Sequence, residues 1–428
     1  MFSQNGLSLD QAPPISVVFR FFLSGSLFGI LFGTLVLFFQ NNIFRIDSAE
    51  ALIATHTLTL GVMLSFMFAA LFQMLPVIAG VTLQSPIRKA NFVQYPFVLG
   101  TITLLLAFKS SISWLFILAS LLLGGSILSI AAIMLKNLFK LQNHSSSSKG
   151  ILTALISLCL VVLLALYMTT ALAGYTDGEY YTYIKKAHYS FGLFGWIALL
   201  IISISFQVIE MFYVTPPYPR LVSHYLPLTL LLLIAFTTFT AFYIPTLWKT
   251  SNIVLALLLS GYALLTLKRL TQRKRPLADA TVWFWRLGLS SLLVSMLTII
   301  CSMFTDISII HTLSYLFFAT FALSIVFAMF YKIIPFLTWF HLNSQGYFSA
   351  PMMHEVIHPK TAMKHLYIHI LTLISFLLSL FFQPFIYTAG ILTLLSFGWM
   401  LWQIIHAWKL YLYTQETGEK FDMGNMHY

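Results

Sequence analysis

The chain has 428 residues, of which 59% are hydrophobic and only 8% are charged. A soluble globular protein carries roughly 25% charged residues, so this composition excludes an ordinary soluble domain. The apolar runs are continuous and long and do not alternate with polar residues, which excludes a lipid-facing β-barrel and predicts an all-α membrane protein. The net charge of +11 does not indicate nucleic-acid binding, because the basic residues lie in short connections, where they set orientation. We therefore expect membrane lipid as a partner and no nucleic acid.

Twelve apolar segments are long enough to cross a bilayer, which needs about 20 residues for each helix. In chain order they lie at approximately 16–40, 54–80, 92–108, 111–135, 151–174, 188–214, 226–246, 252–268, 281–304, 309–336, 367–388 and 390–408. The connections are mostly short, so sequential helices should be antiparallel neighbours. We predict one membrane domain over residues 1–428.

Lys and Arg are unevenly distributed between the two sides of these spans. The side after every second span, together with Arg20 and Arg286 at the same ends, holds 18 of the 23 basic residues. The opposite side holds only five, namely Arg45, Lys109, Lys185, Lys186 and Lys249. Because basic residues are retained on the cytoplasmic side, both termini are predicted to be cytoplasmic.

Three histidines lie near the starts of spans 2, 6 and 10. His56 opens HTLTLGVMLSFMF, His188 opens HYSFGLFGWIALL, and His311 opens HTLSYLFFATFAL. Their spacing of about 120 to 130 residues leaves room for four spans each. The chain is therefore interpreted as three pseudo-repeated four-helix units, at approximately 16–140, 150–270 and 280–410.

An imidazole within a membrane span is costly unless it is paired or ligating, so each of these histidines is a candidate site residue. Imidazoles from two helices can hold one haem iron on either side of the flat macrocycle. On the same face as His188, Gly192 and Gly195 would leave room for a flat group or, equally, for close packing of another helix.

Charged residues at the inner ends of the spans have two possible roles. Glu210, Arg286 and Lys332 are either boundary charges whose long side chains reach the interface or groups that handle protons. No catalytic residue can be assigned beyond these candidates.

The connection between spans 10 and 11 is rich in histidine. It contains His341, His354, His358, His365 and His369. The spacing of His354 to His358 and of His365 to His369 could bind a metal on a helix, whereas a histidine-rich amphipathic loop is the alternative. The role of this segment stays open.

Two resemblances follow from these segments. His311-Thr-Leu-Ser-Tyr, followed by Ala319-Thr-Phe-Ala-Leu-Ser-Ile, resembles helix ten of haem–copper oxidase subunit I. That resemblance implies a twelve-helix fold with threefold pseudo-symmetry, haem ligation by His56 and His311, and His188 beside a second metal. Span 7, Leu226 to Thr246, has no histidine and span 10 has one, so the copper site of an oxygen reductase is incomplete.

The second resemblance is to NnrS-like proteins, a twelve-span family associated with haem, copper and nitric oxide stress. It rests on Val18-Phe-Arg-Phe-Phe in span 1 and on the His56 segment, which ends in Leu75-Pro-Val-Ile-Ala-Gly. It implies haem b, with copper as a further metal, and a small diatomic ligand.

We therefore expect a haem-binding protein of the bacterial inner membrane, linked to nitric oxide or respiratory redox chemistry and not a full oxygen reductase. If the protein is an enzyme, these resemblances imply a haem-dependent oxidoreductase. Two alternatives stay open: a multi-pass transporter, because three repeats around an axis also suit a transport pathway, and a non-catalytic assembly subunit, in which the histidines only join helices.

Overall fold

The computed structural model describes residues 12–275 and 277–420, and these are helical almost throughout. The helices are α1 Ile15–Phe39, α2 Ala49–His56, α3 Ser65–Ala79, α4 Pro86–Ser110, α5 Ser113–Phe139, α6 Ser146–Leu172, α7 Tyr181–Ser190, α8 Leu199–Tyr213, α9 Arg220–Tyr243, α10 Pro245–Thr271, α11 Ala280–Ser302, α12 Ser308–Ser344, α13 Met353–Val356, α14 Pro359–Ser379 and α15 Phe385–Thr417. Short helical segments lie between some of them, namely η2 Gln40–Phe44, η3 Thr57–Leu64 and η4 Phe191–Ala198. The described residues contain no strand, and the single bridge joins Tyr347 to Lys420.

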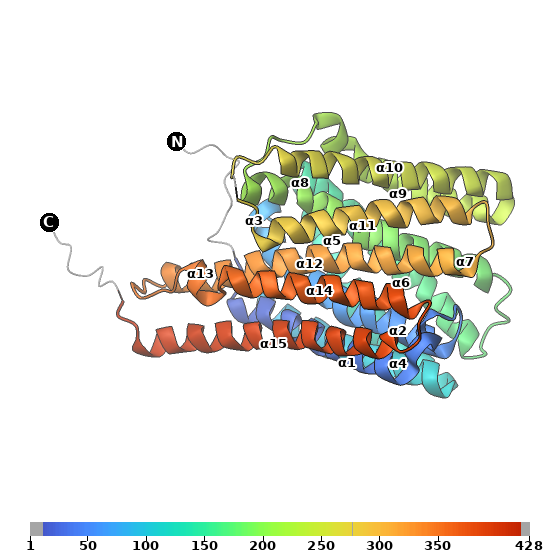
Figure 1. The fold of residues 1–428 in the computed structure, drawn as a ribbon, viewed down its shortest axis with the longest axis horizontal. Helices are drawn as coiled ribbons and strands as arrows, with labels where there is room; N and C mark the ends of the chain where they lie inside the picture. Colours follow the sequence, from blue (N-terminus) through green and yellow to red (C-terminus); the bar gives the residue numbers. More distant parts are fainter. Residues whose placement is uncertain (1–11, 276, 421–428) are drawn as a thin grey trace.

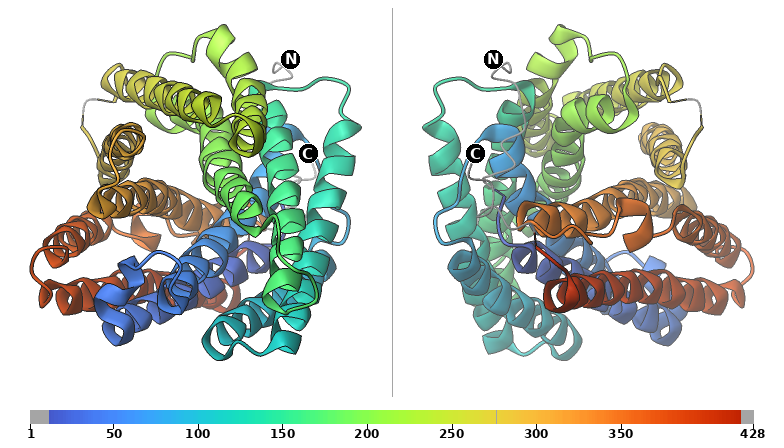
Figure 2. Two further views of the ribbon diagram at one scale, coloured as in Figure 1. Left: turned by 90° about the vertical axis from the view of Figure 1, so that its right-hand side faces the viewer. Right: turned by 90° about the vertical axis from the view of Figure 1, so that its left-hand side faces the viewer.

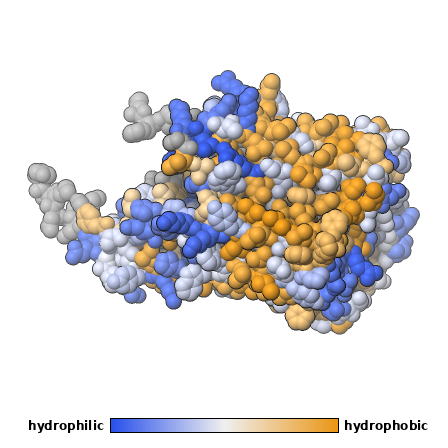
Figure 3. Space-filling view, viewed as in Figure 1, coloured by the Kyte–Doolittle hydropathy of each residue, from blue (hydrophilic) through white to orange (hydrophobic). Residues whose placement is uncertain are grey.

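Twelve helices of the described chain are long and apolar enough to span a membrane, as the sequence predicts. Two of these spans are composite: α2, η3 and α3 form Ala49–Ala79, and α7, η4 and α8 form Tyr181–Tyr213. The surface has a broad apolar band with hydrophilic residues at both ends of the bundle (Figure 3). This distribution is that of a multi-pass membrane protein in contact with lipid.

The chain travels once around the bundle (Figure 1; Figure 2). Neighbouring helices pack in chain order from α4 to α6 and from α9 to α12, and α15 closes the ring against α1. The number of spans is even, so the start of α1 and the end of α15 lie at the same end of the molecule (Figure 1).

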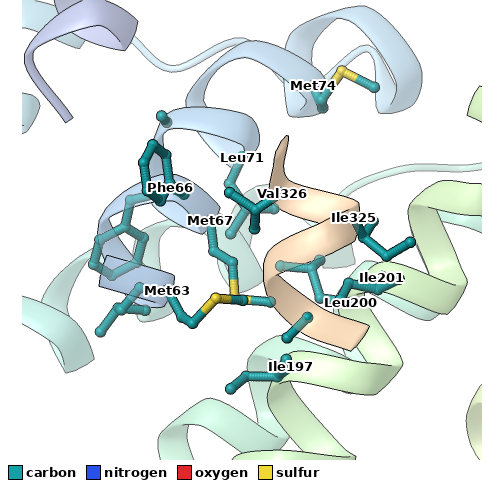
Figure 4. Close-up of a cluster of buried hydrophobic side chains, with 14 of the residues drawn as sticks. Met63, Phe66, Met67, Leu71, Met74, Ile197, Leu200, Ile201, Ile325 and Val326 are labelled. Carbon is teal, nitrogen blue, oxygen red and sulfur yellow. The ribbon is translucent and has the colours of Figure 1, made fainter. Parts of the chain in front are cut away.

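Three spans lie inside this ring. Their most apolar windows are 78% buried in Ala49–Ala79, 78% in Tyr181–Tyr213 and 56% in Ser308–Ser344, against 33% to 50% in the other nine. These three spans are the ones that carry His56, His188 and His311. The interior between them is filled by side chains such as Met67, Leu200 and Val326 (Figure 4).

Local signals set several helix ends. Ser48 caps the start of α2 by accepting a hydrogen bond from the Ala51 amide, and Asp279 caps α11 by accepting from the Val282 amide. Gly80 ends α3 with a φ of 64°, in the left-handed region that favours glycine. Pro359 is the first residue of α14, where its missing N–H costs nothing.

Candidate functional site

The imidazole rings of His56 and His188 lie close together in the interior of the bundle. Each is the eighth residue of its span, counted from the start of Ala49–Ala79 and of Tyr181–Tyr213. Seven rises of 1.5 Å separate the first residue from the eighth, so both histidines lie about 10 Å along the helix from its start. Their ring centroids are 6.4 Å apart and their ring planes differ by 23°. The structure thus brings together two histidines that are 132 positions apart in the sequence.

The hydrogen bonds of the two imidazoles define which nitrogen carries the proton. Nδ1 of His56 lies 2.8 Å from the carbonyl oxygen of Leu52, and Nδ1 of His188 lies 3.1 Å from that of Val161. A carbonyl oxygen can only accept, so each Nδ1 donates and each neutral ring keeps its lone pair on Nε2. Within the described part of the chain neither Nε2 has a hydrogen-bond partner. This is the arrangement of metal-ligating histidines.

The separation of the rings suits a shared metal ion. A bond of about 2 Å from each imidazole nitrogen to a metal, with about 1.1 Å from that nitrogen to the ring centre, gives ring centroids about 6.2 Å apart on opposite sides. The observed distance is 6.4 Å. The separation of the two rings therefore matches that of two imidazoles that share one metal ion.

A π-helical segment lies beside each of these two histidines. The segment η3 begins at Thr57, directly after His56, and η4 begins at Phe191, three residues after His188. Each is eight residues long. Such segments are rare and often occur at functional sites, because an extra residue in the turn re-aims the side chains that precede it.

The helices that carry the two histidines pack mainly against other partners. α2 and η3 contact α1 and α4, whereas α7 and η4 contact α6 and α9. At the end of the bundle near the histidines, Nζ of Lys185 lies 2.9 Å from Oδ1 of Asp47, which ties the start of α7 to the turn before α2. The two imidazoles thus lie between α2 and α7, and the ion pair of Lys185 with Asp47 connects these helices near the histidines.

Glycines let the π-helical segments approach their neighbours. A Cβ at Gly61 would lie 2.5 Å from Cγ of Phe28, and one at Gly195 would lie 2.8 Å from Oγ of Ser157. At these two positions the glycines serve helix packing. A Cβ at Gly192 would meet only Cγ2 of Val161, at 3.9 Å, so this glycine leaves space beside His188. The ring of Phe108, centred 5.0 Å from that of His56, lies beside the site.

His311 stands apart from this pair. It is the fourth residue of the span Ser308–Ser344, one helical turn nearer the end of its helix than the other two. Within residues 12–275 and 277–420 no ring contact or side-chain hydrogen bond joins its imidazole to His56 or His188; only its backbone carbonyl is engaged, by the Ser314 hydroxyl. The structure therefore pairs His56 with His188, whereas the resemblance to the oxidases pairs it with His311.

The three candidates for proton handling lie in separate local settings. Glu210 accepts a hydrogen bond of 2.9 Å from the Tyr218 amide. Lys332 forms an ion pair of 2.7 Å with Asp279 and lies over the ring of Tyr213. Arg286 lies over the ring of Trp283 on its own helix, with 4.6 Å from Cζ to the ring centroid. The structure does not assemble them into one site.

Two further histidines lie on a buried helix face. α14 begins at Pro359, ahead of the span predicted from 367, so His365 as well as His369 belongs to this helix and not to the connection before it. His365 is hydrogen-bonded to the Tyr331 hydroxyl through Nδ1 (2.9 Å) and to the Ser396 hydroxyl through Nε2 (2.6 Å).

His369 makes a similar contact one turn further along α14. Its Nε2 lies 2.9 Å from the hydroxyl of Ser324, and the ring of Phe327 packs against both histidines. The four-residue spacing of His365 and His369 is the signal that indicates a shared helix face. In this structure that face joins α14 to α12 and α15 by hydrogen bonds.

The remaining histidines of this segment are dispersed. His354 lies in the short helix α13, and His358 is the capping residue before α14, where its Nδ1 accepts from the Lys360 amide. These two are therefore not on one helix. His341 lies near the end of α12, with its ring against Phe340. Among the described residues no three His, Cys, Asp or Glu side chains gather closely enough to hold a metal ion by themselves.

No model of a known protein family matches the chain, and no curated protein matches it in sequence. The site formed by His56 and His188 is therefore the basis for a functional proposal.

Proposed function

We propose that this chain is a haem-binding membrane protein in which His56 and His188 ligate one haem iron through their Nε2 atoms. The observation that carries the proposal is the pair of neighbouring imidazoles, 6.4 Å apart between ring centroids, with both Nδ1 atoms donating to backbone carbonyls. The ligand pair proposed here replaces the pair His56 and His311 that the oxidase resemblance implies.

The number of protein donors favours haem over a bare metal ion. Zn²⁺ in structural sites takes four protein ligands, and copper and other transition-metal sites normally draw on several nitrogen or sulfur donors. The described residues offer two imidazoles here and no third acidic, thiol or imidazole group. A macrocycle provides four ligands of its own and needs only the two axial ones that this site offers.

The donor set fits such a group. Both rings present a free Nε2, each Nδ1 is fixed by a carbonyl that also orients the ring, and the surroundings are the apolar interior of a membrane bundle. A bound haem would supply one-electron chemistry, with a potential raised or lowered by its axial ligands and burial. The protein would hold both imidazoles as the tautomer with the proton on Nδ1, each at the eighth residue of its span.

The wider assignment rests on architecture. Three buried spans at positions 2, 6 and 10, each with a histidine near its start, support three pseudo-repeated units of the kind found in haem–copper oxidase subunit I. The basic residues favour cytoplasmic termini, and the resemblance to the two bacterial haem protein families implies the inner membrane. The lack of a histidine cluster among the described residues favours electron transfer over reduction of oxygen to water. Nitric oxide chemistry would require one of the two imidazoles to leave the iron.

The test is an absorption spectrum of the detergent-purified protein from haem-replete cells, with total iron and copper determined on the same sample. The proposal predicts about one haem per chain and a Soret band that sharpens and shifts on dithionite reduction. A colourless protein with one copper per chain would instead favour Cu(I) held linearly by the same two imidazoles. A colourless protein without either metal would reject the site.

A further inference from the structure

A small apolar cavity lies where the three interior spans meet. It has a volume of about 60 Å³ and is lined by residues of α1, α3, α8, α11 and α12, among them Met67, Ala70, Leu200, Trp285, Val326 and Met329. Figure 4 shows several of these side chains converging from the three interior helices. Met67 lies eleven residues after His56, so the cavity lies further along the bundle than the histidines.

The lining decides what this space can hold. One water needs roughly 10 to 15 Å³ of such volume and two to four polar partners. The volume is ample, but the atoms that line the cavity are almost all apolar, from aliphatic, thioether and aromatic side chains. The Trp285 indole N–H is the one buried polar atom of these side chains that lacks a partner, and a single partner is fewer than a water needs, whereas an apolar atom or diatomic molecule needs none.

The walls are part of the tightly packed interior. The exposed fractions are 3% for Phe66, 1% for Leu200 and 1% for Trp285. Native interiors leave few voids larger than one water molecule, because each void forfeits dispersion contacts of the atoms that line it. An occupant of matching polarity would restore those contacts.

From this geometry we infer that the cavity is a binding site for a small apolar gas molecule, of the size of xenon or of a diatomic gas. Such molecules concentrate in the hydrocarbon of a bilayer and can reach a membrane-embedded cavity without crossing water. The inference does not depend on the metal site, because the cavity's lining includes neither His56 nor His188.

The experiment is diffraction from crystals of the full chain pressurised with xenon, which is identified by its anomalous scattering. We expect a xenon peak between Met67, Leu200 and Val326. Ala70→Val adds two methyl groups at the cavity wall and should abolish that peak. Ala132→Val, on the exposed face of α5, is the matched control and should leave it unchanged.

If Ala70→Val does not yield folded protein, Val326→Ile places one added methylene in the same space and should lower the xenon occupancy. Ordered water or a lipid chain in the wild-type cavity would overturn the inference. So would xenon bound elsewhere in the crystal but absent from this cavity, or a peak that survives both wall substitutions.

Discussion

At the residue scale, His56 and His188 can be recognised from the sequence because each interrupts an apolar span near its start. Their pairing cannot be recognised in this way. The direction of an imidazole depends on the helix turns around it. The turns next to these two histidines are the π-helical segments η3 and η4, and their apolar sequences do not differ from those of an ordinary span. The resemblance to the oxidases implies His311 as the partner of His56, whereas in the structure that residue lies one turn nearer the start of its own span than His56 and His188 do in theirs.

The burial of His365 and His369 illustrates a second limit at this scale. Lys360, Lys364 and the histidines lower the average hydropathy of the first turns of α14, so the sequence indicates a polar loop. In the structure one face of these turns carries the exposed lysines, while the opposite face is buried against α12 and α15. An average over a window cannot separate two faces of one helix.

Asp279 supports a prediction about pH. Burial raises the pKa of its carboxyl, but the charge and hydrogen bond of Lys332, with the Thr281 hydroxyl and Val282 amide, outweigh burial and hold that pKa below its ordinary value. A lowered folded pKa means that the stabilisation is present above the unfolded pKa, about 3.9, and is lost as pH falls through the folded value.

Asp279→Asn keeps an oxygen that can cap α11 and loses the ion pair, whereas Asp279→Ala loses both. We expect Asp279→Ala to cost about 1 kcal/mol more than Asp279→Asn. The ion pair itself is worth at most about 1 kcal/mol, because the Asp279 side chain is 43% exposed. Thermal unfolding in detergent at pH 7 and near pH 3 measures the stability differences among wild type, Asp279→Asn and Asp279→Ala. A difference between wild type and Asp279→Asn that does not shrink at the lower pH would contradict the assignment.

At the scale of helices, the sequence gives the number and order of the spans but not their full lengths. The last span is predicted to end near 408, and α15 continues to Thr417. Hydropathy indicates which residues lie within the bilayer. A helix continues beyond the bilayer where its polar end still packs against its neighbours. The π-helical segments could not be predicted from the sequence either, because their apolar residues do not differ from those of an ordinary span.

The segment η3 yields a test of how the site is aimed. Deleting Thr59 removes one residue from the π-helical stretch and restores the ordinary α-helical repeat. His56 would then turn by about 100° relative to α3, away from His188. We expect the Thr59 deletion to lose the haem spectrum, whereas Thr59→Ala, which keeps the length, retains it. If both the Thr59 deletion and Thr59→Ala keep the haem spectrum, with folding verified by circular dichroism, η3 has no role in orienting His56.

At the scale of the whole molecule, composition and the distribution of apolar segments are enough to predict a twelve-span helical membrane protein, and the structure confirms that number. The arrangement of nine outer spans around three inner ones is not evident from hydropathy, because all twelve segments are apolar. It becomes visible only through burial, where the three histidine-bearing spans stand out.

Orientation in the membrane is a prediction at this scale. The distribution of 18 basic residues on one side and five on the other places both chain ends in the cytoplasm. A fluorescent protein fused to the C-terminus should fluoresce, and alkaline phosphatase fused after Asp177 should be active. The opposite result for both fusions would place His56 and His188 near the cytoplasmic face.

If His56 and His188 share one metal centre, the spin state of the bound iron depends on both imidazoles. This spin state can be read from absorption and electron paramagnetic resonance spectra of wild type, His188→Ala and His311→Ala. Two axial imidazoles give low-spin iron, so we predict low-spin spectra for wild type and His311→Ala, and high-spin iron or loss of haem for His188→Ala. A low-spin centre that survives His188→Ala and is lost in His311→Ala would contradict the account and restore the pairing implied by the oxidase resemblance.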